Sequence, residues 1–288
     1  SRTAEISPGG FSLADVPQKK EERNMNEVIV ITGGSSGIGF ATAAALRKRN
    51  CRVYELSRRN VKHENGVLHL SADVTDEAAV KAAIDTVIAR EGRVDVLICN
   101  AGFGISGAAE FTENEAAKHL LDVNLFGAVN AVKAVLPRMR AQHSGRILCI
   151  SSIAAPVPIP FQAWYSVSKA AVRAYASALR GEVSTFGIQV ASILPGDIRS
   201  GFTGSREKSC AGDDVYMGRI SRSVAVMEHD ERTGMTAEAA GEAIARIASK
   251  GRLKPDYAIG LPYKGVMLLL RILPGRLTSW IVRQIYAR

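Results

Sequence analysis

A tyrosine and a lysine stand four residues apart in the chain, as Tyr165 and Lys169. On a helix this spacing places both side chains on one face, so the phenol and the ammonium group are expected to be neighbours. A free phenol has a pKa of about 10, and a nearby cation favours its ionised form, which brings the pKa closer to neutrality. The pair therefore predicts general acid/base chemistry. A pair of surface side chains on a helix is the alternative, and the surrounding motifs must decide.

A glycine-rich turn follows the first strand-like run, residues 28–31, and leads directly into a segment with helical spacing. Glycine lets the backbone approach a pyrophosphate closely, and the free N–H groups at a helix start attract the anion. Between a strand and a helix, such a turn is typical of dinucleotide binding, and an ordinary tight turn is the alternative. The residues expected to contact a cofactor here are Gly33, Ser35, Ser36, Gly37, Ile38 and Gly39.

The end of the second expected strand distinguishes the two nicotinamide cofactors. Folds that bind NAD usually place an acid there, which hydrogen-bonds the adenosine ribose. This chain has Ser57, Arg58 and Arg59 instead. An acid would repel a 2′-phosphate, whereas a hydroxyl and guanidinium groups can bind one, so the sequence predicts NADP(H). The alternative is a solvated pair of loop arginines, which is still expected for one of the two.

The order of motifs resembles the short-chain dehydrogenase/reductase family over residues 26–260. The motifs that carry the resemblance are TGGSSGIG at 32–39, CNAG at 99–102, Asn124, an apolar strand that ends in Ser151 and Ser152, YSVSK at 165–169, and Pro195 with Gly196. The resemblance implies hydride transfer between a nicotinamide cofactor and a ketone or secondary alcohol. Cys99 replaces the usual Asn and Ser200 the usual Thr, and neither change removes a catalytic group.

The same resemblance implies a role for each catalytic side chain. Tyr165 would transfer the proton to or from the substrate oxygen, and Ser152 would hold that oxygen by a hydrogen bond. Lys169 would contact the nicotinamide ribose and lower the tyrosine pKa, while Asn124 would anchor a water molecule in a proton relay. Further cofactor contacts are implied for Asp73, Val74, Asn100, Ala101, Gly102, Tyr165, Lys169, Pro195, Gly196, Ile198 and Ser200.

The elements that must position these residues follow from the hydrophobic pattern. From Glu27 onward, short β-branched runs alternate with longer segments of helical spacing, which is the pattern of βαβ units. We therefore expect an α/β fold with a single Rossmann-type doubly wound parallel sheet of about seven strands and helices on both faces. Strands are expected at 28–32, 52–57, 67–72, 94–100, 146–151, 188–194 and 257–260, and helices at 37–49, 77–91, 113–142, 163–186 and 237–250.

Three parts are expected in the 288-residue chain: a flexible leader at 1–24, the catalytic domain at 25–262, and a basic amphipathic extension at 263–288. The extension carries five Lys and Arg residues and no acid, and Pro274 with Gly275 divides it into two short amphipathic pieces. Such a segment covers the substrate cleft or a neighbouring subunit, which is the favoured interpretation, or it lies on a membrane surface.

Composition excludes several other classes of protein. The net charge is +9, but the extension alone supplies five of these charges, so nucleic-acid binding is not indicated. The four cysteines form no CxxC pair and no zinc-type spacing, so neither a disulfide framework nor a metal site is expected. The same cysteine pattern predicts a cytoplasmic location. No histidine lies in a ligand spacing or beside the motifs, so none is assigned a role.

The substrate is predicted from the segments that form the pocket in this family. Residues 154–161 and Trp164 are apolar or aromatic, which suits a steroid, a bile acid or another lipid-like ketone or alcohol, and 202–226 is expected to be mobile. A 3-oxoacyl-carrier-protein reductase is the alternative enzyme. A non-catalytic NADP(H)-binding sensor or scaffold is the alternative of another class. A homodimer or homotetramer is expected, because family members commonly associate through two long helices, here 113–142 and 163–186.

Overall fold

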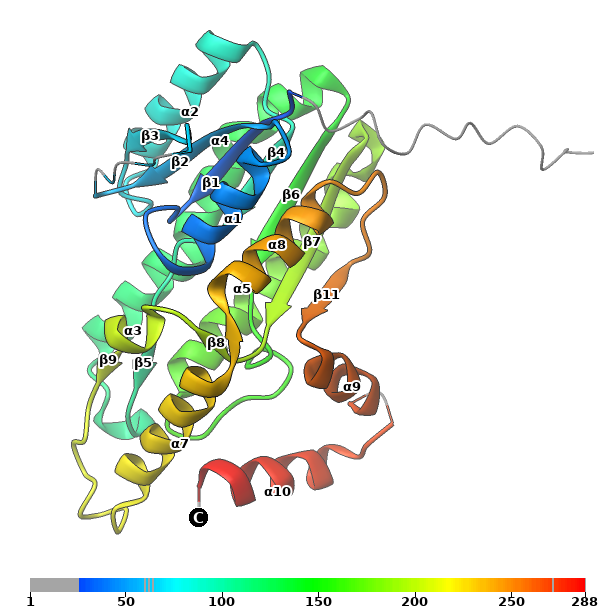
Figure 1. Ribbon diagram of the computed structural model, residues 1–288. Coiled ribbons are helices and arrows are strands. Elements are labelled where there is room, and N and C mark those ends of the chain that lie inside the picture. The colour runs from blue at the N-terminus through cyan, green and yellow to red at the C-terminus, as the bar shows by residue number, and fades with distance from the viewer. Residues whose placement is uncertain (1–25, 60, 62, 64, 271, 288) are drawn as a thin grey trace, which may run out of the picture.

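Seven parallel strands form one sheet in the computed structural model, which describes residues 26–287 except 60, 62, 64 and 271 (Figure 1). The predicted leader at 1–24 lies outside the described residues. Along the sheet, the order of strands is β11-β7-β6-β4-β1-β2-β3. The strands are β1 (Val28–Thr32), β2 (Arg52–Ser57), β3 (Leu68–Ser71), β4 (Val96–Cys99), β6 (Gly145–Ile150), β7 (Ile188–Pro195) and β11 (Asp256–Ile259). The predicted fold class is confirmed.

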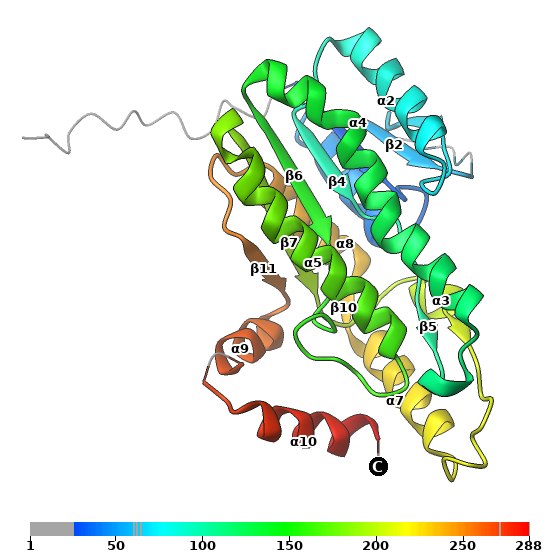
Figure 2. The ribbon, with the colours of Figure 1, turned by 180° about the vertical axis from the view of Figure 1, so that it is seen from behind.

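Helices cover both faces of the sheet, which explains why strands such as β1 and β4 are buried at every residue. One face carries α1 (Gly37–Arg47) and α8 (Ala237–Ala248), which lie in front of the sheet in Figure 1. The reverse view in Figure 2 shows the helices of the other face. These are α2 (Glu77–Glu91), α4 (Gly127–Gln142) and α5 (Ala163–Val183).

The chain reverses its direction of travel across the sheet at β1. From β1 it moves outward to β2 and β3, and then returns to β4 on the other side of β1. In such a doubly wound sheet a crevice opens at the carboxyl ends of the strands flanking this reversal. The glycine-rich turn follows β1 directly, so the topology places it at that crevice.

The middle of the predicted helix at 113–142 differs from a regular α-helix. The structure has α3 (Asn114–Leu121), a π-helical turn η3 (Asp122–Phe126) and then α4, joined without a break. Together they are long and apolar enough to cross a membrane. However, α4 packs its apolar face against the sheet, where Val132, Val135 and Met139 are completely buried. We therefore interpret this segment as a core helix.

A small layer beyond the carboxyl edge of the sheet was not predicted in detail. Two short parallel pairs form there, β5 (Ile105–Ser106) with β9 (Glu207–Lys208), and β8 (Ile198–Arg199) with β10 (Met235–Thr236). They hold a segment that contains α6 (Phe202–Ser205) and α7 (Arg219–Thr233). The stretch expected to be mobile, 202–226, thus contains α6, β9 and the start of α7. Short 3-10 turns lie at Ala109–Phe111 and Ser184–Phe186.

The C-terminal segment forms two helices on either side of Pro274. They are α9 (Leu261–Leu269) and α10 (Gly275–Tyr286), and both views show them beyond the carboxyl ends of β7 and β11 (Figures 1 and 2). Helix α9 follows β11, and α10 packs against α7. The extension is therefore folded onto the same end of the molecule as the crevice.

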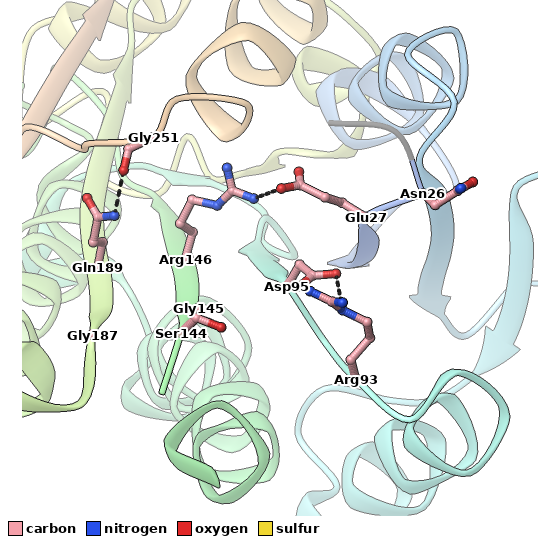
Figure 3. A pocket seen from close by; sticks show the side chains of 10 residues that line it. All are labelled: Asn26, Glu27, Arg93, Asp95, Ser144, Gly145, Arg146, Gly187, Gln189 and Gly251. Atoms are coloured by element: carbon pink, nitrogen blue, oxygen red, sulfur yellow. Dashed lines mark hydrogen bonds and ion pairs between the residues drawn. The ribbon is translucent and has the colours of Figure 1, made fainter. Parts of the chain in front are cut away.

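The opposite, amino edge of the sheet contains a hollow of about 380 Å³ (Figure 3). Its charged side chains satisfy one another, because Arg146 pairs with Glu27 and Arg93 pairs with Asp95. Asp95 also accepts a hydrogen bond of 2.8 Å from the backbone N–H of Val28. These contacts tie the starts of neighbouring strands together, so we interpret this hollow as structural.

Candidate active site

A cavity of about 630 Å³ lies at the carboxyl edge of the sheet and extends from the glycine-rich turn to α6 and α7. All of the residues that the sequence predicted as cofactor contacts line it, although they come from six separate stretches of chain. Ser152 lines it as well, and among the four predicted catalytic residues only Asn124 does not. The topology therefore gathers the motifs into a single place.

The glycine-rich turn is shaped by close backbone approaches. Gly33 has a φ of +68°, and a Cβ atom there would lie 2.8 Å from the Cα of Ala101. A Cβ atom on Gly39 would lie 2.3 Å from the carbonyl oxygen of Gly33, so α1 can start only if this residue is glycine. The turn thus presents bare backbone to the cavity, as the approach of a pyrophosphate requires.

Thr32 and Asn100 join the ends of β1 and β4 beneath this turn. The hydroxyl of Thr32 accepts hydrogen bonds from the backbone N–H groups of Asn100 and Ala101, at 3.0 and 3.1 Å. The Asn100 amide donates to the carbonyl oxygens of Thr32 and Gly33, at 3.1 and 3.0 Å. Sequence reasoning missed the part that Thr32 plays, because a buried threonine at a strand end has no distinctive spacing.

The start of α1 fits an anion. Its N-cap residue, Ser36, makes no capping bond with its side chain, and the first turn of this eleven-residue helix holds no acid. Free N–H groups at the amino end of a helix, together with its dipole, attract phosphate groups. Combined with the glycine-rich turn, this end of the cavity fits the pyrophosphate of a dinucleotide.

Cationic side chains border the same end of the cavity. Arg59 donates a hydrogen bond of 3.4 Å to the hydroxyl of Ser36, and the guanidinium of Arg58 lies 3.9 Å from the carboxylate of Asp73. Partial burial raises the pKa of Asp73, but hydrogen bonds from Thr75 and the charge of Arg58 outweigh this effect and lower it overall. Asp73 therefore stays ionised as an acceptor, and both arginines line the cavity.

Tyr165, Lys169 and Ser152 meet at the other end of the cavity. Helix α5 carries the tyrosine and the lysine on one face, and the Lys169 nitrogen lies 5.7 Å from the centre of the phenol ring. Ser152 follows the end of β6 and hydrogen-bonds the phenol. The predicted catalytic trio is thus a cluster of neighbours in the structure.

The electrostatics of this cluster differ from the sequence expectation. Burial raises the pKa of Tyr165 to about 12, and the hydrogen bond with Ser152 opposes the rise only in part. Burial also lowers the pKa of Lys169 to about 8. The ammonium group donates to the carbonyl oxygen of Ile150 at 3.0 Å. The expected lowering of the tyrosine pKa is therefore not present here, because burial of the phenol is the largest influence and Lys169 is not among the groups that lower this pKa.

Asn124 lies in the π-helical turn behind Lys169 and is 2% exposed. Its amide oxygen accepts from the N–H of Phe103 at 2.9 Å, and its amide nitrogen donates to the Phe103 carbonyl and to the Ser168 hydroxyl, both at 3.0 Å. A Cβ atom on Gly102 would lie 2.8 Å from the amide oxygen of Asn124 and 3.4 Å from the Lys169 nitrogen, so both side chains lie close to this glycine. The predicted water relay remains a prediction. Turns of this π type often occur at functional sites.

The cavity agrees only in part with the pocket that the sequence predicted. Phe202, from the stretch 202–226 that was expected to form the pocket, lines the cavity, and its ring lies 5.6 Å from that of Tyr165. Glu231 of α7 had no signal in the sequence; it lines the cavity while its carboxylate pairs with Arg206. The Arg206 side chain is completely buried. His119 also lines the cavity, although no histidine was assigned a role, and Trp164, which was expected to form the pocket, does not line it. These placements depend on contacts between distant segments.

Tyr263 of α9 fastens the C-terminal extension to the cavity wall. A Cβ atom on Gly196 would lie 1.9 Å from its ring, so the ring packs flat against the backbone after β7. The Tyr263 hydroxyl donates to the carboxylate of Asp197 and accepts from its N–H at 3.1 Å. Burial raises the pKa of Asp197, and the bond from Tyr263 partly offsets that rise.

The fold and this cluster define a Rossmann-type oxidoreductase site. Residues 27–211 match the family model described as short chain dehydrogenase, and the chain belongs to this family. A 3-ketodihydrosphingosine reductase of Bacteroides thetaiotaomicron is 41% identical over 257 residues, which cover 88% of this chain and 93% of that protein. Estradiol 17-beta-dehydrogenase 1 of Rattus norvegicus is 36% identical over 61% of this chain and 55% of its own length.

The solved structures show the same architecture. A short-chain dehydrogenase from Streptomyces avermitilis is 28% identical and superposes with a TM-score of 0.75, covering 88% of this chain and 96% of its own. Members of the family bind NAD(H) or NADP(H), which agrees with the glycine-rich turn and the anion-binding start of α1. The chain is therefore an oxidoreductase of this family.

Proposed function

We propose that the protein is an NADP(H)-dependent reductase that interconverts ketones and secondary alcohols of lipid-like substrates. The observation that carries the proposal is the meeting of Tyr165, Ser152 and Lys169 in the cavity that begins at the glycine-rich turn. When bound, the nicotinamide supplies or accepts the hydride. The protein supplies binding, orientation and the proton.

The side chains of the cluster supply the proton and orient the substrate. With a pKa of about 12, the Tyr165 phenol is protonated at neutral pH and can donate its proton to the oxygen of a ketone. Ser152 can hold the same oxygen by a hydrogen bond. The Lys169 ammonium, held by Ile150, places a positive charge where negative charge develops on the phenol oxygen. The ring of Phe202 lies beside that of Tyr165, 5.6 Å from its centre.

The choice of NADP(H) rests on the residues after β2. Arg58 and Arg59 line the cavity beside Ser57, and a 2′-phosphate can accept charge-assisted hydrogen bonds from guanidinium groups. The nearest acid in β2, Glu55, is completely buried and interacts with His69 below the turn. It does not line the cavity, so its charge is not presented to the phosphate.

Replacing Arg58 with glutamine should weaken NADPH binding roughly ten- to a hundredfold, which corresponds to a loss of about 1.5 to 3 kcal/mol. The affinity for NADH should change little, because NADH lacks the 2′-phosphate. Titration of the nicotinamide fluorescence measures both affinities. Arg140→Gln, an exposed change on α4, is the matched control. Equal use of NADH and NADPH by the unmodified protein would remove this assignment.

The substrate class rests on the lining of the cavity near Tyr165. Apolar side chains from three segments face it, namely Phe103, Ile159 and Phe202, and the carboxylate of Glu231 lines it as well. This combination suits an apolar body with a polar group near the reacting carbon. Two relatives named above are a 3-ketodihydrosphingosine reductase and an estradiol 17-beta-dehydrogenase, which supports a lipid-like substrate for this chain.

A panel of ketones tests the substrate class and its alternatives together. We expect kcat/KM with NADPH to be at least about tenfold higher for long-chain amino ketones or steroid ketones than for short ketones, because burial contributes about 0.8 kcal/mol per methylene. The rate of NADPH oxidation is the readout. If kcat/KM is highest for 3-oxoacyl-carrier-protein thioesters, the protein is a 3-oxoacyl-carrier-protein reductase instead. Binding of NADPH without turnover of any ketone would favour a sensor.

The assembly and the location are part of the proposal. The outer faces of α4 and α5 are available for a homodimer or homotetramer, and large apolar side chains such as Phe126 and Val167 are exposed nearby. The proposed cytoplasmic location rests on the sequence alone, because the four cysteines form no CxxC pair and no zinc-type spacing. No cluster of three or more metal-binding side chains occurs in the part of the chain that the structure describes.

A further inference from the structure

Exposed apolar side chains concentrate in the two C-terminal helices. Within the described residues, sixteen large hydrophobic side chains are exposed, and eight of them lie between residues 261 and 285. We call these eight the C-terminal apolar face. They are Leu261, Leu268, Leu269, Ile272, Leu277, Trp280, Ile281 and Ile285. Soluble proteins rarely gather so much apolar surface without a partner for it.

Helix α10 has two apolar sides, and only one of them is used within the chain. Its inner side packs on α7, where Val282 is 9% exposed and the Tyr286 hydroxyl donates to Asp230 at 3.3 Å. The outer side carries Leu277, Trp280, Ile281 and Ile285, spaced at i, i+3, i+4 and i+8. This spacing forms a continuous stripe on one helix face. The stripe faces solvent and has no partner among the described residues.

Helix α9 repeats this arrangement. Tyr263 turns inward onto Gly196, as described above, and fixes the orientation of the helix. Leu261 and Leu268 lie seven residues apart on α9, again the spacing of one helix face, and are 81% and 60% exposed. Ile272 lies in the turn after the helix and is 76% exposed. The C-terminal apolar face therefore continues from one helix to the next.

Only positive charges accompany this face. No Asp or Glu follows Asp256, whereas the sequence contains Lys264, Arg271, Arg276, Arg283 and Arg288 after it. Arg276 and Arg283 are exposed on α10. A surface that combines apolar side chains, a tryptophan and unopposed cations complements the headgroup region of an anionic bilayer.

We propose that the C-terminal apolar face binds an anionic lipid bilayer, with α9 and α10 lying in the plane of the interface. The helices have 9 and 12 residues, which is too short to span the hydrocarbon core, for which about 20 are needed. Trp280 sits at the level of the headgroups, and the arginines reach the lipid phosphates. A second copy of this chain is a poorer occupant, because a symmetric contact would bring two acid-free basic surfaces together.

The attachment would place the active-site cavity beside the bilayer. Gly196 and Asp197 line the cavity and contact Tyr263 of α9, and Glu231 lines it from α7, against which α10 packs. Figures 1 and 2 show both helices at this end of the molecule. A lipid substrate could then enter the cavity directly from the bilayer. This entry route rests on the proposed function, whereas the attachment itself does not.

Sedimentation with vesicles tests the attachment. The full chain should sediment with vesicles of mixed phosphatidylcholine and phosphatidylserine, and much less with phosphatidylcholine alone. The double change Trp280→Glu and Ile281→Glu should lower the partition coefficient at least about tenfold. A matched double change at exposed positions elsewhere, Leu68→Glu and Phe186→Glu, should leave it within about twofold. Circular dichroism confirms that each variant is folded.

The charge contribution is tested separately. Removing Arg276 and Arg283 by substitution with glutamine should lower the partition coefficient roughly ten- to thirtyfold, because each cation near an anionic surface contributes about 1 kcal/mol. The pair Arg140→Gln and Arg252→Gln removes two exposed charges elsewhere and should have little effect. All variants should reduce a water-soluble ketone at the wild-type rate.

Three outcomes would overturn the attachment. The first is equal sedimentation of the wild type and the Trp280 and Ile281 variant, and the second is equal binding to neutral and anionic vesicles. The third is a protein that ignores vesicles but becomes a smaller oligomer when Trp280 and Ile281 are changed, which would identify a protein interface. A Tyr165→Phe protein should bind the vesicles as the wild type does, so this test of attachment does not depend on the proposed activity.

Discussion

Replacing Tyr165 with phenylalanine should lower kcat for ketone reduction roughly 10²- to 10⁴-fold, the range that a positioned general acid contributes. The ring remains, so its packing against Phe202 is preserved, and only the proton donor and its hydrogen bond with Ser152 are lost. NADPH binding should be nearly unchanged. Steady-state rates of NADPH oxidation, combined with fluorescence titration of the cofactor, measure the two effects separately.

Tyr175→Phe provides the matched control for this prediction. Tyr175 lies on the same helix, and burial likewise raises its pKa, but it packs against the core and does not line the cavity. Its replacement should change kcat by less than about threefold. A Tyr165→Phe protein with the kcat of the wild type would show that another group delivers the proton.

Replacing Lys169 with methionine should reduce kcat at least about a hundredfold and, at the same time, stabilise the fold. The activity falls because the charge that stabilises the developing phenolate is lost. The fold gains because burial of the ammonium disfavours its charged form, and methionine fills a similar volume without a charge. The gain in the free energy of unfolding at pH 7 is expected to be up to about 3 kcal/mol.

The sign of this effect can be checked against pH. The pKa of Lys169 in the folded chain is about 8, below the value of about 10.4 for an unfolded lysine. Between these pH values the unfolded chain binds more protons at this position, so the wild type gains stability as the pH rises. The stability difference between Lys169→Met and the wild type should therefore shrink from pH 8 to pH 10. Urea unfolding at several pH values measures it, and a methionine variant less stable than the wild type would contradict the account.

Much of the fold could be predicted because its signals are local. The bounds of β1, β2 and α2 agree with the sequence expectation. Helix α2 is delimited by its own neighbours, since Asp76 caps its start by accepting from the N–H of Ala79 and Gly92 ends it in a left-handed conformation. Buried strands can likewise be predicted from runs of consecutive β-branched residues.

The remaining features depend on contacts between distant segments. The π-helical turn at Asn124 depends on packing against Phe103 and Ser168, and the Arg206–Glu231 pair joins α7 to the segment after α6. Nothing in the local pattern marks either feature. The pKa of Tyr165 could not be predicted for a related reason: the spacing to Lys169 gives proximity, but only the complete fold determines how deeply the phenol is buried.

The transfer of deuterium from NADPH that carries two deuterium atoms on the reactive carbon of the nicotinamide tests the central claim most directly. With a long-chain ketone, the account predicts one deuterium on the carbinol carbon of the product, detected by mass spectrometry, and almost none with the Tyr165→Phe protein over the same time. If NADPH is consumed while the alcohol carries no deuterium, or if the phenylalanine variant labels the product as fast as the wild type, the assignment of Tyr165 and of this cavity is contradicted.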